Sequence, residues 1–271
     1  MENELQKLKM KNTLFIWRSH VLFVSYEETN AFHQHYSLSI VLSVDQPAKL
    51  FLPNEETLDY SGVLIPPNYF HKHEAKGTHL FILQIDPHSP LLKGHFGILE
   101  QEVVRFDANL IPNLRGTAEK IINDDASCEE ALFLCESMIQ AASQSIGDMN
   151  SSKQIDPRIL SALKYLQSLE DLNEDMSLNY LAGMAQLSED RFRHLFKENL
   201  SISIRRYILN LRVRRTALLF YRGMNMTQAA RKAGFADSAH FSRTFREVYG
   251  HSPSAVLKNK KRIKVRFCEE L

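Results

Sequence analysis

Two pairs of histidines, His33 with His35 and His71 with His73, have a spacing that could support chemistry. Alternate residues of a β-strand face the same side, so each pair would place two imidazoles on one face. Imidazoles bind transition metals, and they also form hydrogen bonds when they line a pocket. We expect a polar cluster that lines or rims a pocket, and we predict no bound metal and no other cofactor.

The C-terminal half contains two segments that share one layout of a short helix, a three-residue turn and a longer helix. Apolar periodicity and turn residues place the first at 178–185 and 189–199, and the second at 226–233 and 237–249. This layout is that of the helix-turn-helix unit, whose second helix enters the major groove of DNA. We therefore predict two units that read DNA.

The residues of the longer helices support this prediction. Ser188 and Asp237 stand where a side-chain oxygen can accept a free amide of the first helical turn. Phe192 and Phe241 belong to apolar faces that would be buried, and this turns the basic residues outward.

The outward basic residues have two expected roles. Arginine can donate to both major-groove acceptors of guanine, although most arginines on such helices contact phosphate and some are only solvated. In the two segments the residues left to face outward are Arg193, His194 and Lys197, and His240, Arg243 and Arg246.

Many further residues recur at a fixed spacing. The second segment has Ala230, Gly234, Phe235, Asp237, Phe241, Ser242, Arg243, Phe245, Gly250, Ser252 and Pro253, and the first has Leu181, Ala182, Ser188, Phe192, Leu195, Phe196, Lys197, Tyr207 and Arg212. With these residues, 157–257 closely resembles the paired helix-turn-helix domain of the arabinose-regulator (AraC/XylS) family. The resemblance implies a sequence-specific transcription regulator of bacterial promoters, usually an activator, that binds double-stranded DNA as a homodimer and contacts RNA polymerase.

The resemblance also implies which residues meet the DNA. Gln186 stands where the family usually has glycine, and Ser201 and Ile204 replace a glycine and a proline. The position of Gln186 tends to need a positive φ, which costs a residue with a side chain on the order of 1 kcal/mol. We therefore expect the first helix-turn-helix unit to be less stable than the second. The family's base-reading positions fall on Asp190, Arg193 and His194 and on Ser238, Ala239, His240, Ser242 and Arg243, and Ser188, Lys197 and Arg246 complete the expected DNA-binding set. Of these, we expect Arg193 and Arg243 to read bases, and Lys197 and Arg246 to contact phosphates.

The charge of the chain is divided unevenly between its halves. Residues 151–271 contain 22 lysines and arginines against 12 acids, whereas residues 1–150 contain 11 against 20. The overall net charge of +1 therefore combines a basic half with an acidic half. A basic surface favours nucleic-acid binding without specifying a sequence, which agrees with the predicted units.

The elements that position these residues predict an α+β chain. Short apolar clusters between turn residues indicate strands from about 13 to 107, and helical periodicity follows at 111–123 and 129–143. We expect the apolar stripe of the second helix to support a homodimer. A helix over 203–222 would join the two DNA-reading units. The expected domains are 1–146, a linker at 147–156, the DNA-binding domain at 157–258, and a mobile basic tail at 259–271.

The N-terminal half resembles, more weakly, the cupin-like β-barrel that is common in the same family. The similar pieces are the two histidine pairs, residues 63–67 and residues 86–87. The resemblance implies that His33, His35, His71 and His73 belong to an effector pocket for a small molecule. Cupin metal sites add a glutamate about four residues after the first pair, where this chain has Ser39 and Ile40.

Other features narrow the function further. The chain has three cysteines, too few and too scattered to predict a disulfide framework. Cys128 and Cys135 lie seven residues apart on an expected helix, so both would face the same hydrophobic core. We find no catalytic set and no phosphate-binding or dinucleotide motif, so we expect a non-enzyme that acts in the cytoplasm without membrane contact. Two alternatives stay open: a regulator controlled by a protein partner, and a metal-dependent cupin fused to a DNA-binding module.

Overall fold

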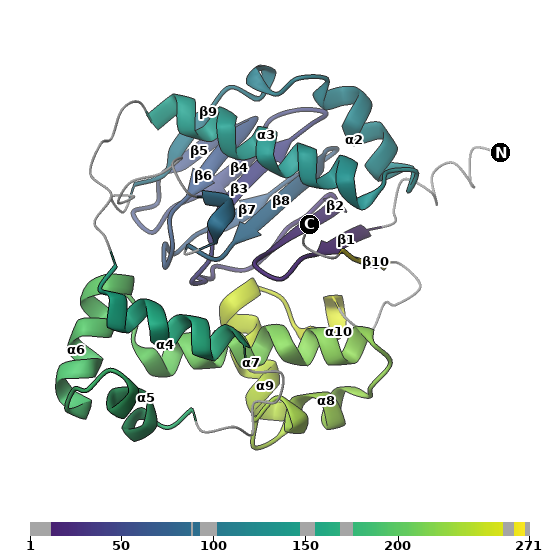
Figure 1. The fold of residues 1–271 in the computed structure, drawn as a ribbon. Coiled ribbons are helices and arrows are strands. Elements are labelled where there is room, and N and C mark those ends of the chain that lie inside the picture. Colours follow the sequence, from purple (N-terminus) through teal and green to yellow (C-terminus); the bar gives the residue numbers. More distant parts are fainter. Residues whose placement is uncertain are drawn as a thin grey trace. The chain divides into compact units, whose positions relative to one another are not determined.

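The computed structural model describes residues 12–87, 89–92, 102–146, 155–168, 176–256 and 263–268. The chain forms two compact units, Met1–Ser152 with Tyr249–Leu271, and Lys153–Val248. Most of the expected linker, residues 147–154, lies outside the described residues. Each unit is described separately below (Figure 1).

The first unit is built from two β-sheets, which confirms the expected β-rich N-terminal domain. The larger sheet has the strand order β10-β1-β2-β8-β3-β6-β9, and the smaller has the order β5-β4-β7. Every pair of neighbours is antiparallel except β1 and β10, which are parallel. The strands are β1 Asn12–Ile16, β2 His20–Tyr26, β3 Leu38–Ser43, β4 Ala48–Phe51, β5 Thr57–Tyr60, β6 Gly62–Ile65, β7 Lys72–Glu74, β8 His79–Ile85, β9 Val104–Phe106 and β10 Ile263–Phe267.

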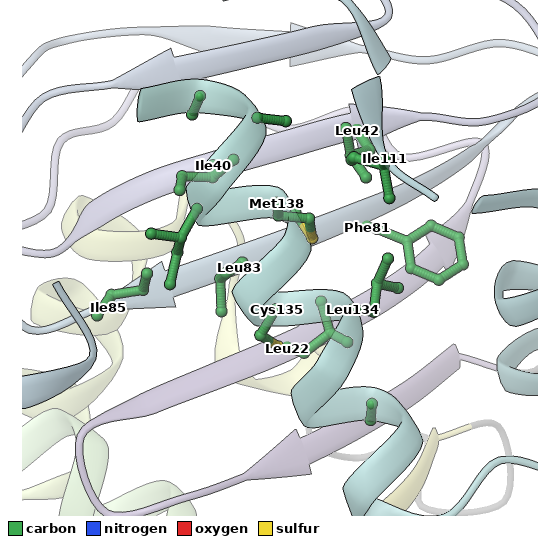
Figure 2. Close-up of a cluster of buried hydrophobic side chains, with 14 of the residues drawn as sticks. Leu22, Ile40, Leu42, Phe81, Leu83, Ile85, Ile111, Leu134, Cys135 and Met138 are labelled. Carbon is green, nitrogen blue, oxygen red and sulfur yellow. The ribbon is translucent and has the colours of Figure 1, made fainter. Parts of the chain in front are cut away.

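Two helices, α2 (Leu114–Ile122) and α3 (Cys128–Ile146), lie over one face of the larger sheet (Figure 1). Leu134 and Met138 of α3 point toward the strands and pack with Ile40 and Leu83 in one buried cluster (Figure 2). The apolar stripe of α3 therefore covers the sheet, and the expectation that it is left over for dimerisation is wrong. Short 3-10 turns at Pro90–Leu92 and Ala108–Leu110 precede these helices.

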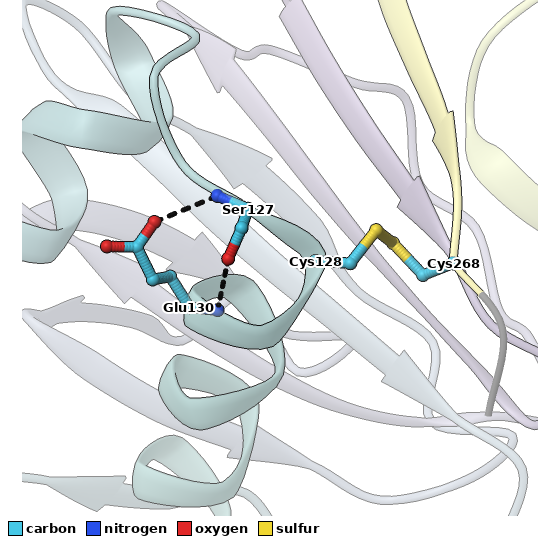
Figure 3. The surroundings of a disulfide bond; sticks show 4 residues. All are labelled: Ser127, Cys128, Glu130 and Cys268. Atoms are coloured by element: carbon cyan, nitrogen blue, oxygen red, sulfur yellow. Dashed lines mark hydrogen bonds between the residues drawn. A yellow bond between two sulfur atoms is a disulfide. The ribbon is translucent and has the colours of Figure 1, made fainter. Parts of the chain in front are cut away.

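The start of α3 is fixed by a reciprocal pair of hydrogen bonds (Figure 3). The amide of Glu130 donates to Ser127 Oγ at 3.1 Å, and the amide of Ser127 donates to Glu130 Oε2 at 2.8 Å. This capping box satisfies two amides that the helix itself cannot pair. It holds the first turn of α3, where Cys128 lies.

The end of the chain returns to the first unit. Strand β10 extends the sheet beside β1, and a disulfide joins Cys128 to Cys268, 140 residues apart (Figure 3). Arg266 donates to Asp124 at 2.8 Å, and Lys264 pairs with the same carboxylate. The expectation of a mobile tail is therefore wrong for residues 263–268. Cys135 is a buried free cysteine, as expected, and Cys128 packs against the same hydrophobic cluster. The expectation that Cys128 is also a free cysteine is wrong, because it forms the disulfide.

The second unit is helical, and its two predicted helix-turn-helix segments are confirmed with bounds that differ by one residue. Among the described helices of the whole chain, none is both long and apolar enough to cross a membrane. The helices are α4 Pro157–Ser168, α5 Leu178–Met184, α6 Glu189–Leu200, α7 Ile204–Tyr221, α8 Met226–Lys232 and α9 Ser238–Tyr249, and α10 Pro253–Val256 follows in the segment assigned to the first unit.

The turns between the helices have the expected local chemistry. Ser188 Oγ accepts from the amide of Arg191 at 3.3 Å, and Asp237 Oδ1 accepts from the amide of His240 at 2.6 Å, so both predicted N-caps are confirmed. The hydrogen bond from the His240 amide lowers the pKa of Asp237. Gln186 has a φ of 53°, as its place in the turn predicts, and Gly234 has a φ of 86° in the second turn.

Cys268→Ser is expected to destabilise the first unit under non-reducing conditions, because it removes the cross-link that holds β10. Loss of a native disulfide typically costs about 2–5 kcal/mol. Urea denaturation followed through the buried Trp17, the only tryptophan, measures the change. A reductant should lower the midpoint of the wild type to that of the variant and leave the variant unchanged. Equal urea midpoints of the wild type and the variant without reductant would contradict the pairing of Cys128 with Cys268.

Gln186→Gly is expected to stabilise the second unit by about 1 kcal/mol, since glycine adopts a positive φ without a Cβ penalty. Gly234→Ala is expected to destabilise it by about 1 kcal/mol or more for the opposite reason. A Cβ there would also lie 2.9 Å from Arg212 Nε. Denaturation followed by the helical circular dichroism signal measures both changes. Shifts of the two variants in the same direction would refute this account of the turns.

Candidate nucleic-acid interface and a buried histidine cluster

The outer face of α6 presents the first set of predicted DNA-contacting residues. Phe192, Leu195 and Phe196 are buried on the inner face of this helix. Because side chains recur every 3.6 residues, burying this face leaves the positions between them in solvent. Ser188 caps the helix at its start, where it is itself exposed. The residues that α6 exposes include Asp190, Arg193, His194 and Lys197.

The guanidinium of Arg193 is held by two acids of its own helix. It donates to Asp190 Oδ1 at 2.8 Å and lies 3.4 Å from Glu189 Oε2. The Arg193 side chain is 54% exposed, so solvent screens these pairs and they are broken at little cost. A guanine with two acceptors could therefore replace the carboxylates. Glu189 was not among the residues expected from the sequence, although its i, i+4 spacing to Arg193 is a usable signal.

The outer face of α9 presents the second set. Phe241, Phe245 and Val248 are buried on the inner face. The hydroxyl of Ser242 donates to the carbonyl of Ser238 at 2.8 Å, so this group is engaged within the helix. Of the predicted residues, Ala239, Arg243 and Arg246 are exposed, whereas Ser238, His240 and Ser242 are half-buried.

The long helix α7 joins the two reading units. Its 18 residues span about 27 Å at 1.5 Å per residue. Burial lowers the pKa of Arg212 in this helix, and its guanidinium lies beside Gly234. A pocket of about 390 Å³ is lined by Arg193 of α6, His240 of α9, Arg205 and Arg212 of α7, and by Met176, Leu178, Ile204, Ile208 and Leu209. Residues of both reading helices thus meet at α7.

The four histidines predicted to share a pocket do lie together in the first unit. His33 and His71 are opposite each other in an antiparallel bridge, with backbone hydrogen bonds of 2.9 and 3.0 Å in the two directions. The ring centroids of these two residues are 4.4 Å apart, and those of His35 and His73 are 5.3 and 5.1 Å from His71. All four side chains are buried.

Backbone carbonyls orient three of these imidazoles. The Nδ1 atoms of His33, His35 and His71 lie 3.0, 2.9 and 2.8 Å from the carbonyl oxygens of residues 31, 37 and 69. A carbonyl oxygen only accepts, so each Nδ1 carries the proton and each Nε2 carries a lone pair. Burial, and then a neighbouring histidine, lowers the pKa of each to about 3, so these rings are neutral near pH 7.

The fourth histidine has different partners. Nδ1 of His73 lies 2.9 Å from the hydroxyl of Tyr60, and its backbone amide donates to Asn30 at 2.8 Å. Burial lowers the pKa of His73 well below its usual value, and burial raises the pKa of the Tyr60 phenol. Neither Tyr60 nor Asn30 was expected from the sequence, because these residues lie 13 and 43 positions away from His73.

Comparison with known proteins agrees with the geometry of the second unit. Residues 181–259 match the family model of the helix-turn-helix domain. The Msm operon regulatory protein of Streptococcus mutans is 30% identical over 80 residues, which are 29% of this chain and 29% of that protein. The arabinose operon regulatory protein of Escherichia coli is 31% identical over 129 residues, 46% of this chain and 42% of that protein. The chain therefore matches less than half the length of these relatives.

Solved structures resemble the chain over more of its length. Apo ToxT from Vibrio cholerae has a TM-score of 0.62 at 17% identity, covering 89% of this chain and 97% of that one. ToxT with an unsaturated fatty acid bound has a TM-score of 0.58 at 15% identity, covering 88% and 95%. At these identities the likeness concerns the fold, a β-rich N-terminal domain followed by a helical one. Over residues 181–259 the chain therefore matches the helix-turn-helix domain, and its C-terminal region is similar to that of the arabinose operon regulatory protein.

Proposed function

We propose that this protein is a sequence-specific DNA-binding transcription regulator of bacterial promoters and acts as an activator. The observation that carries the proposal is the pair of helix-turn-helix units, each with a buried aromatic face and an exposed polar face. The names of the curated relatives, which are regulatory proteins of operons, support the same class of function.

In the two helix-turn-helix units, the DNA contacts would be divided by residue type. The second helices, α6 and α9, would enter successive major grooves, with α7 as the spacer between them. Arg193 and Arg243 would donate to guanine, whereas Lys197 and Arg246 would contact phosphates. The remaining predicted residues of these two helices would border the bases.

The N-terminal β-rich domain would control this activity by binding a small molecule. A ToxT structure contains a bound unsaturated fatty acid, which supports a small-molecule effector for a protein of this fold. The four buried histidines would border the effector site. The regulator would act in the cytoplasm as a homodimer and would contact RNA polymerase. Phe133, 54% exposed on the outer side of α3, is the residue of that helix best placed to meet a second copy.

The affinity of the full-length protein for DNA is expected to fall steeply with salt. Each phosphate contact made by a lysine or arginine releases counterions, and about six contacts correspond to a loss of roughly 10³-fold between 50 and 200 mM salt. Fluorescence anisotropy with a labelled duplex measures this slope. A folded protein without affinity for any duplex at low salt would refute the proposed function.

Arg193→Ala is expected to lose discrimination at particular base pairs, by about 1–3 kcal/mol for a bidentate contact. Lys197→Ala serves as its matched comparison on the same helix face. It should weaken all duplexes alike and lower the salt slope by about one. Binding to a matched operator, to single mismatches and to random DNA separates the two patterns. If Arg193→Ala weakened matched and random DNA equally, Arg193 would be a phosphate contact.

A further inference from the structure

We infer that His33, His35 and His71 form a binding site for one divalent transition-metal ion. Each of these residues offers one ring nitrogen, and the three nitrogens lie within 4.8 Å of one another. In a tetrahedral site with metal–nitrogen bonds of 2.0–2.1 Å, ligand nitrogens are about 3.3 Å apart. Side-chain rotations that move each nitrogen inward by about 1 Å would close the site.

The backbone prepares these three imidazoles for a metal. Histidines that bind metals almost always donate their second ring N–H to a carbonyl or carboxylate, which fixes the tautomer and the orientation of the ring. The Nδ1 atoms of all three residues already have such carbonyl partners at 2.8–3.0 Å. The bridge between His33 and His71 further fixes two of them across neighbouring segments.

The nitrogen that would bind the metal from His71 is unsatisfied. His71 is 1% exposed, and its Nε2 has no hydrogen-bond partner among the residues that the structure describes. A buried acceptor without a partner is destabilising, so most are satisfied by a ligand, a water or a protein group. Within the described part of the chain, the hydrogen-bond contact of the His35 Nε2 is the hydroxyl of Ser39, at 3.2 Å, and this hydroxyl can rotate away.

The donor set indicates the class of metal. Imidazole suits zinc, copper, iron and nickel, whereas magnesium and calcium prefer oxygen ligands. Three histidines with an open fourth position are a known zinc arrangement. The absence of the cupin glutamate, which argued against a bound metal, therefore does not exclude a metal at this site. Because the ligands are neutral, the open position would suit water or an anionic group. This inference does not depend on the proposed DNA binding.

The test uses the full-length, tag-free chain after treatment with a chelator and removal of that chelator. Titration with Co²⁺, followed by visible absorption, and equilibrium dialysis with Zn²⁺, followed by elemental analysis, are both expected to give one ion per chain. Thermal denaturation should show a higher midpoint with Zn²⁺, because the ion binds the folded state. A chain that retains no ion and shows no shift of its midpoint would overturn the inference, whether or not it binds DNA.

Two matched variants locate the site. His71→Gln is expected to weaken Zn²⁺ binding by about 100-fold or more, since loss of a residue that only hydrogen-bonds to a metal ligand already costs about 10–100-fold. His79→Gln replaces another buried histidine, whose Nδ1 lies 2.8 Å from Asp45, and should leave binding unchanged. Ser39→Ala keeps all three ligands and should bind Zn²⁺ at least as tightly as the wild type. Equal Zn²⁺ binding by folded His71→Gln and the wild type would overturn the assignment. If His71→Gln fails to fold, the assignment is overturned by a loss of Zn²⁺ binding in Ser39→Ala.

Discussion

Burial of one aromatic face on each reading helix is the interaction on which the second unit depends. The rings of Phe192 and Phe196 lie 5.9 Å apart, and those of Phe241 and Phe245 lie 5.6 Å apart. The ring of Tyr207 meets Phe196 edge-on at 5.6 Å, so α7 shares the core of the first reading unit. Because helix geometry couples the two faces, fixing the aromatic face inside presents the polar face to solvent. The exposure of the predicted residues of α6, and of Ala239, Arg243 and Arg246 of α9, is thus a consequence of packing.

Much of the second unit could be predicted from the sequence because its determinants are local. The caps at Ser188 and Asp237, the left-handed turn at Gln186 and the helical periodicity each involve residues within about four positions. The exposure of the candidate DNA-binding residues follows from that same periodicity. The clamp of Glu189 and Asp190 on Arg193 is also local, and it shows that a candidate reader can have an acidic partner in the absence of DNA.

The features that could not be predicted are non-local. The partners Cys128 and Cys268 are separated by 140 residues, and nothing in the local pattern of either cysteine indicates the other. The pairing of Asp124 with Lys264 and Arg266 places part of the basic charge counted for the C-terminal half in the first unit. For the histidines, the sequence predicted that the four residues lie together, but the expectation that His33 and His35 lie on a strand is wrong, since both fall between β2 and β3. The carbonyls that fix their tautomers depend on the folded backbone.

The central claim is that both reading units contact DNA in a sequence-specific manner. Selection of bound duplexes from a random pool by the full-length protein, followed by sequencing, tests it most directly. We expect an enriched motif with two conserved elements centred about 10–10.5 base pairs apart, one for each reading helix. Recovery of duplexes without any enriched motif, from a folded and DNA-binding protein, would contradict the claim.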